Sequence, residues 1–127
     1  MQKVLEGLTR IVGVRGSLFV ARDGIIIASH LPQEISEERV AALVADMART
    51  TEESLHRMQR GPLRHAEIDA AGGRVFLQDA DKGILVVLSE PQVNIGLIRL
   101  EMKAASDKLK RLVAGAGQAA ATTGQES

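Results

Sequence analysis

The chain has 127 residues, enough for one domain, and its core must be aliphatic because 45% of the residues are hydrophobic and only 2% are aromatic. Basic and acidic residues balance at 16 each, and tryptophan and tyrosine are absent, so neither charge nor stacking rings favour a nucleic-acid partner. Without cysteine, the chain has no disulfides, thiolate catalysis or cysteine-bound zinc.

The opening stretch, MQKVLEGLTRIVGV, is interrupted by charged residues in a way that does not suit a signal peptide. No apolar run in the sequence reaches the roughly 18 residues that a membrane span needs. We therefore expect a cytoplasmic protein that does not insert directly into a membrane.

The first part of the chain predicts a helix followed by a hairpin. Apolar residues at helical spacing between Val4 and Val12 predict a short amphipathic helix that ends at Gly13. Nearly continuous apolar runs at 17–22 and 24–29 predict two strands that are covered on more than one side. Asp23 and Gly24 lie between these runs, and this pair favours a two-residue type I′ turn, in which both residues have positive φ.

A long helix is predicted to begin after Ser36 and to end at Gly61–Pro62. Its apolar stripe is expected to face the core and comprises Val40, Leu43, Val44, Met47, Thr51, Leu55 and Met58. A second stripe beside it has side chains small enough for another backbone to approach closely, and comprises Ala41, Ala45 and Ala48, followed by Glu52.

The segment LRHAEIDA, residues 63–70, alternates in polarity as an edge strand does. One face of the predicted strand carries Leu63, His65, Glu67 and Asp69. An open edge pairs with another strand, but charged side chains also commonly protect an edge from pairing. The residues of this segment alone favour neither interpretation.

The rest of the folded part predicts two more strands and a helix. The strand RVFLQ follows a turn at Gly72–Gly73, and ILVVLSE is apolar enough to be a central strand. Pro91 and Asn94 introduce the last helix, which we expect to end near Val113. We predict one domain over residues 1–113 and a flexible low-complexity tail over 114–127. The predicted α/β fold is of the α+β type, an antiparallel five-stranded sheet with three helices in the order α-β-β-α-β-β-β-α.

No group of residues indicates catalysis. The histidines His30, His56 and His65 are interpreted as surface or interfacial residues, because no complete set of metal ligands surrounds them in the sequence. DADKG resembles the start of a calcium loop, but the strand that follows cannot return a carboxylate to the same ion. Phosphate-binding motifs are missing, and Arg22 is interpreted as a surface arginine. We therefore expect a non-enzyme without catalytic, cofactor-binding or metal-binding residues.

Two stretches carry a family resemblance. FVARDGIIIAS resembles the first hairpin of the roadblock/LC7 superfamily, and NIGLIRLEMKAASDKL, with Asn94, Gly96, Arg99 and Glu101, is similar to its closing helix. The resemblance extends from Gln2 to about Val113. It implies a five-stranded antiparallel sheet with one helix on one face and two on the other, and a dimer formed by the third strand and the second helix. The dimer interface that it implies comprises Ala41, Ala45, Ala48, Glu52, Leu63, His65, Glu67 and Asp69.

Among bacterial members, the likeness is to gliding-protein regulators of the MglB type, which regulate a Ras-like GTPase as dimeric activators. The resemblance implies a homodimeric regulator or scaffold of a small Ras-like GTPase. The contacts hypothesised for this GTPase are Arg39, Asp46, Arg49 and Glu53. One alternative is a dimeric adaptor in signalling or motility complexes that does not contact a GTPase. Another is an enzyme or small-ligand sensor on a profilin-like or PAS-like scaffold.

Overall fold

A computed structural model of the chain describes residues 1–126, with side chains described as far as residue 115. It contains the predicted elements in the predicted order. They are α1 (Gln2–Thr9), β1 (Val14–Val20), β2 (Ile26–His30), α2 (Glu37–Arg57), β3 (His65–Ala70), β4 (Gly73–Asp79), β5 (Ile84–Ser89) and α3 (Ile95–Glu126).

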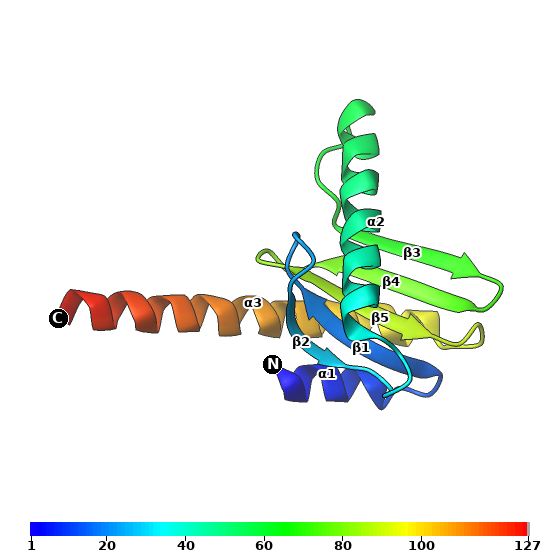
Figure 1. The fold of residues 1–127 in the computed structure, drawn as a ribbon, viewed down its shortest axis with the longest axis horizontal. Coiled ribbons are helices and arrows are strands. Elements are labelled where there is room, and N and C mark those ends of the chain that lie inside the picture. Colours follow the sequence, from blue (N-terminus) through cyan, green and yellow to red (C-terminus); the bar gives the residue numbers. More distant parts are fainter. Residues whose placement is uncertain (127) are drawn as a thin grey trace.

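The five strands form one antiparallel sheet in the order β2-β1-β5-β4-β3. β5 lies at its centre and β3 at one edge, so both sequence predictions about strand position are confirmed. α2 packs on one face of the sheet, and α1 and α3 pack side by side on the other (Figure 1). The arrangement leaves β2 and β3 as the two edge strands.

The central strands are buried on both faces, which explains their nearly continuous apolar sequence. In β1, Phe19 packs with Leu5 of α1 and Met102 of α3, whereas its neighbours Leu18 and Val20 pack beneath α2. These five side chains lie in two aliphatic cores, one on each side of the sheet.

The first hairpin has a longer turn than the two-residue Asp23–Gly24 connection that the sequence predicts. Gly24 donates its N–H to Ala21 O at 2.9 Å, and Ala21 donates to Ile25 O at 2.8 Å. Gly24 alone has positive φ, +93°, whereas a type I′ turn requires positive φ at both central residues. The strands therefore end at Val20 and begin again at Ile26.

α2 ends at Arg57, before the predicted stop at Gly61–Pro62. Arg60 donates its N–H to Leu55 O and Gln59 donates to His56 O, which is the hydrogen-bond pattern of a Schellman cap. Gln59 occupies the left-handed position of this cap with φ +57°, where glycine is the usual residue.

α3 is longer than predicted. The sequence predicts a helix end near Val113, but α3 continues to Glu126 and projects beyond the sheet (Figure 1). Residues 114–126 contain five alanines, the best helix former, and three glycines, which are poor helix formers. Extending a helix that already exists costs little compared with starting one. The flexibility of residues 114–127 stays a prediction, and residue 127 lies outside the described residues.

Candidate interaction surface

The open edge of β3 presents a regular row of backbone groups. Asp79 donates its N–H to Arg64 O at 2.8 Å, and the register places these two residues opposite one another. Because hydrogen-bonded pairs alternate in an antiparallel ladder, the N–H and C=O groups of His65, Glu67 and Asp69 point away from β4. These three residues therefore offer the backbone donors and acceptors of the open edge.

The β2 edge differs from the β3 edge in two ways. The register of β1 with β2 shifts so that Ile27 is an extra residue, a bulge of the kind that discourages edge pairing. Gln2 of α1 also donates a hydrogen bond to Ser29 O at 3.0 Å. β3 pairs with β4 without a register shift from His65 to Ala70. Of the two edges, β3 is the one shaped to accept another strand.

The face of α2 that packs on the sheet lies between the two stripes predicted from the sequence, so the predicted core stripe is right in part, and Val44 is buried as predicted. Ala41, Ala45 and Ala48 are at most 8% exposed and pack toward the sheet of their own chain, so the predicted availability of this stripe to a second copy is wrong. Leu43 and Met58, predicted to be core residues, are 58% and 59% exposed. Small side chains line the inner face because the helix lies close to the sheet and to the first hairpin.

The exposed apolar and small residues of α2 follow helical spacing along one side of the helix. We call this side the outer stripe, and it comprises Leu43, Met47, Thr50, Ser54 and Met58. Of these, Met47 is half-buried and the other four are exposed. Sequence reasoning assigned Leu43, Met47 and Met58 to the core and therefore missed this surface.

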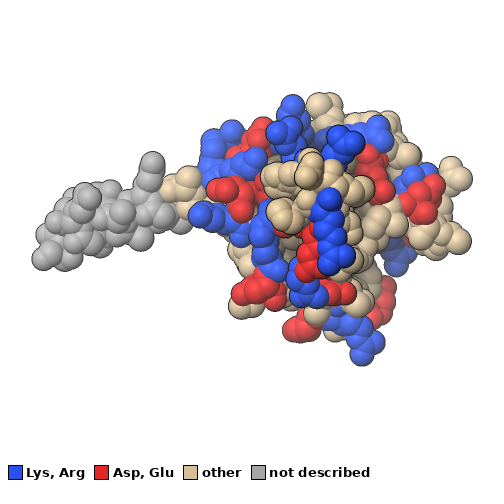
Figure 2. All heavy atoms as spheres, turned by 90° about the horizontal axis from the view of Figure 1, so that it is seen from above, with Lys and Arg blue, Asp and Glu red and all other residues tan. Residues whose placement is uncertain are grey.

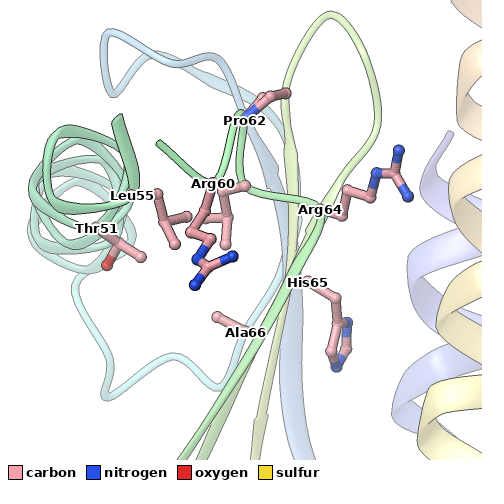
Figure 3. A pocket seen from close by; sticks show the side chains of 8 residues that line it. Thr51, Leu55, Arg60, Pro62, Arg64, His65 and Ala66 are labelled. Atoms are coloured by element: carbon pink, nitrogen blue, oxygen red, sulfur yellow. The ribbon is translucent and has the colours of Figure 1, made fainter. Parts of the chain in front are cut away.

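A groove of about 630 Å³ separates the second half of α2 from the start of β3. Thr51 and Leu55 of α2 and Ala66 of β3 point toward the groove, and the Arg60 side chain lies within it (Figure 3). His65 points to the opposite side of the strand (Figure 3). The groove adjoins both the outer stripe and the open β3 edge, so the three features form one continuous surface.

The side of β3 that faces α3 carries a charged cluster. Arg99 of α3 donates to Glu67 Oε2 at 2.7 Å, and His65 Nε2 lies 3.3 Å from the same oxygen. The hydrogen bond from Arg99 lowers the pKa of Glu67 from its ordinary value of 4.5, against a smaller opposing effect of burial. Leu63 does not share this face as predicted, because β3 begins only at His65 and Leu63 packs beneath α2 with 9% exposure.

Glu52, the remaining predicted interface residue, is engaged within its own chain. Arg22 in the first hairpin forms ion pairs with both Glu52 of α2 and Asp79 of β4. The guanidinium fork thus ties the hairpin, the helix and the sheet together. Glu52 is half-buried in this arrangement, and its carboxylate already has a partner.

Arg39, Asp46, Arg49 and Glu53 are all exposed on α2, and Asp46 forms an ion pair with Arg49. Seen from the end of α2, basic and acidic side chains are interspersed without a broad area of one sign (Figure 2). Such a mixed surface suits recognition by paired charges rather than attraction of a polyanion.

Within the described residues, no group of three or more histidine, aspartate or glutamate side chains is arranged to hold a metal ion. His30 and His56 are exposed and lie on separate elements, at the end of β2 and near the end of α2. None of the helices within the same residues is long and apolar enough to span a membrane.

Residues 1–89 match the family described as the Roadblock/LC7 domain. The uncharacterized proteins MJ0310 and MJ1340 of Methanocaldococcus jannaschii are 38% and 37% identical to the chain over 112 residues, covering 88% of this chain and 98% of each relative. MglB of Myxococcus xanthus has a similar structure with a TM-score of 0.84 at 22% identity, covering 90% of this chain and 94% of that one. A Roadblock/LC7 domain from Streptomyces avermitilis has a TM-score of 0.83 at 17% identity, covering 90% of this chain and 98% of that one. The chain belongs to the Roadblock/LC7 family.

Proposed function

We propose that this protein is a homodimer that regulates or recruits a small Ras-like GTPase. The observation that carries the proposal is the open, regular β3 edge beside an exposed apolar stripe of α2, in a fold shared with MglB. A second copy that pairs along β3 would extend the sheet and bring its own α2 against the outer stripe. The resemblance to MglB-type regulators supports a GTPase as the partner of the completed surface.

A two-fold axis restricts the register of such a pair. His65, Glu67 and Asp69 carry the outward backbone groups, so the paired positions come from this set. A symmetric pair centred on Glu67 places the glutamates of the two copies opposite one another, and like charges in that position repel. The Arg99 side chain beside each Glu67 supplies the compensating charge. Arg99 is therefore part of the proposed interface, in addition to the residues of β3 itself.

The charge pattern of α2 favours an antiparallel arrangement of the two helices. Glu37 and Glu38 lie in its first turn, and His56 and Arg57 lie in its last. In an antiparallel pair, the acidic start of one helix lies near the basic end of the other, whereas a parallel pair would bring like charges together. The two-fold axis of the β3 pairing imposes the same antiparallel direction.

The proposed dimer acts on the GTPase by binding alone. The sequence lacks phosphate-binding loops, so the nucleotide chemistry belongs to the partner, and the dimer acts by favouring one conformation of its switch loops. We retain Arg39, Asp46, Arg49 and Glu53 as the proposed contacts, because all four are exposed beside the outer stripe.

Two measurements test the proposal. Light scattering at micromolar concentration is expected to give the mass of a dimer. A Ras-like GTPase from the same host is expected to hydrolyse GTP at a different rate, or to be retained on the dimer in a nucleotide-dependent way. A monomer would refute the interface. A dimer that neither changes hydrolysis nor binds the GTPase would refute the partner and favour the adaptor function.

A further inference from the structure

Two hollows lie between α1 and α3, and a third lies beyond them, where the segment that follows α1 meets the start of α3. Val4, Lys108, Arg111 and Leu112 line the first, which has a volume of about 300 Å³. The second, of about 90 Å³, also contains Val4 and Lys108. Because the first two hollows share residues and the two helices run in opposite directions (Figure 1), the hollows follow one another along a single groove.

Small residues line the middle of this groove, so a bound segment can approach the two helices closely there. Gly7 of α1 and Ala104 of α3 line the second hollow, and a Cβ atom added at Gly7 would have no heavy atom within 4 Å. Val12 and Leu97 line the third hollow, of about 470 Å³, at the far end. Side chains of a bound segment would therefore find space at each end and close contact with the helices between them.

Apolar side chains are exposed at both ends of the groove. Val12 is 89% exposed and Leu97 is 38% exposed at one end, and Leu112 is 45% exposed at the other. Single exposed apolar residues are common on proteins, but these three line the hollows at the two ends of the groove. Their positions suit two apolar anchors on one bound segment.

The charges of the groove favour an acidic segment. Three basic residues, Lys3, Lys108 and Arg111, and one acidic residue, Glu101, line the three hollows. None of the three basic side chains takes part in an ion pair among the described residues. Over residues 95–115, α3 carries five basic and two acidic residues, whereas α2 carries three basic and five acidic ones. The chain is neutral overall, yet its two helical layers differ in charge, and the cations lie on the α1–α3 side.

We propose that the α1–α3 groove is a second docking site, which binds an acidic segment with apolar residues near both ends from a partner protein. Between Leu97 and Leu112, α3 extends about 22 Å, so the groove fits six or seven extended residues or a helix of about 15 residues. The apolar ends of the segment lie at Val12 and Leu97 and at Val4 and Leu112. Its carboxylates meet the cations of the groove.

The shape of the surface favours a peptide segment over a lipid bilayer. A bilayer would require the apolar side chains to form one patch, but here Val12 and Leu97 are separated from Leu112 by the charged and small residues that line the second hollow.

The test uses fluorescein-labelled peptides of about 15 residues, the length of a helix that spans the groove. One contains leucine and glutamate, and the other has lysine in place of each glutamate. Binding to the full chain is followed by fluorescence anisotropy and by amide chemical shifts. The variants are Leu97→Asp and Lys108→Glu, with Leu100→Asp and Lys110→Glu as matched controls, because Leu100 and Lys110 lie on the same helix and do not line the three hollows.

We expect the glutamate peptide to bind saturably and to shift the amide of Gly7. We expect Leu97→Asp and Lys108→Glu to raise its Kd at least tenfold, and the controls to change it less than twofold. Absence of binding, equal losses in the controls, or binding instead to phosphatidylcholine–phosphatidylserine vesicles would overturn the proposal. The four variants lie on the face opposite α2, so their effect on peptide binding is separable from dimer mass and GTP hydrolysis.

Discussion

Two arginine substitutions placed two residues apart on α2 separate its inner face from its outer stripe. Ala41 is fully buried against the sheet, whereas Leu43 is 58% exposed. We expect Ala41→Arg to make the folded subunit less stable than that of the native chain, without a specific effect on dimer formation. We expect Leu43→Arg to leave the subunit folded and to break the proposed dimer.

The expected sizes follow from burial. At Ala41 an arginine must both overfill the core and bury a charge, at a cost of about 4 kcal/mol or more. Domains of this size are stable by about 5–15 kcal/mol, and each kcal/mol shifts Tm by about 3–5 °C, so Tm should fall by roughly 15 °C. At Leu43, leucine and arginine have similar helix propensities, so the effect within one subunit is about 0.5 kcal/mol or less. Losing one leucine from each copy should raise the dissociation constant of the dimer about a hundredfold, which corresponds to about 3 kcal/mol.

Thermal unfolding followed by circular dichroism, over a hundredfold range of protein concentration, distinguishes the two effects. The Tm of a dimer rises with concentration, because association stabilises the folded state. We expect this dependence for the native chain and for Ala41→Arg, and its loss for Leu43→Arg, with light scattering reporting the mass. A folded monomer produced by Ala41→Arg, or an intact dimer of Leu43→Arg, would show that the assignment of the two α2 faces is wrong.

Three further predictions concern single positions. Gln59→Gly should stabilise the chain by about 0.5–1 kcal/mol in urea unfolding, because glycine adopts the left-handed conformation of the α2 cap without strain, and Gln59→Ala should not. Gly73→Ala should destabilise by about 2 kcal/mol or more, because its Cβ would overlap Ser89 O, whereas Gly72→Ala is the matched neutral control. Arg99→Met should reduce the free energy of unfolding by about 0.5–1 kcal/mol near pH 7, since both side chains are partly exposed. Arg99 lowers the pKa of Glu67, so this difference is present above pH 4.5 and should disappear as the pH falls through the lowered pKa; a difference that persists in acid would contradict the pairing.

The order of elements and the positions of β3 and β5 could be predicted because burial sets the hydrophobic pattern. A strand covered on both faces, such as β5, is apolar throughout, and an edge strand such as β3 tolerates alternating charges. These patterns depend only on neighbours along the chain and on the presence of a core. They do not depend on the distance between one element and the next.

Which side of α2 packs on the sheet could not be predicted, because it depends on the distance between α2 and the first hairpin. The apolar and alanine stripes both suit a core, and the larger side chains of the apolar stripe hide the fact that the buried face lies between the two. In the structure the first hairpin lies against the helix, with Ala45 Cβ only 3.6 Å from the position of a Cβ at Gly24. A contact this close admits alanine and excludes leucine or methionine. Leu43 and Met58 therefore lie on the outer stripe, where only another molecule can cover them, whereas Val44 remains in the core.

The two edges of the sheet show how one chain can both prevent and permit strand pairing. At β2, the bulge at Ile27 breaks the regular hydrogen-bond ladder, and the side chain of Gln2 occupies the carbonyl of Ser29. At β3, the ladder is continuous, but Glu67 would repel its counterpart in a symmetric pair. Arg99, which belongs to α3, pairs with Glu67 and so offsets this repulsion. Charged residues in an edge strand therefore do not by themselves show that the edge is protected from pairing, because a residue far away in the sequence can neutralise the charge.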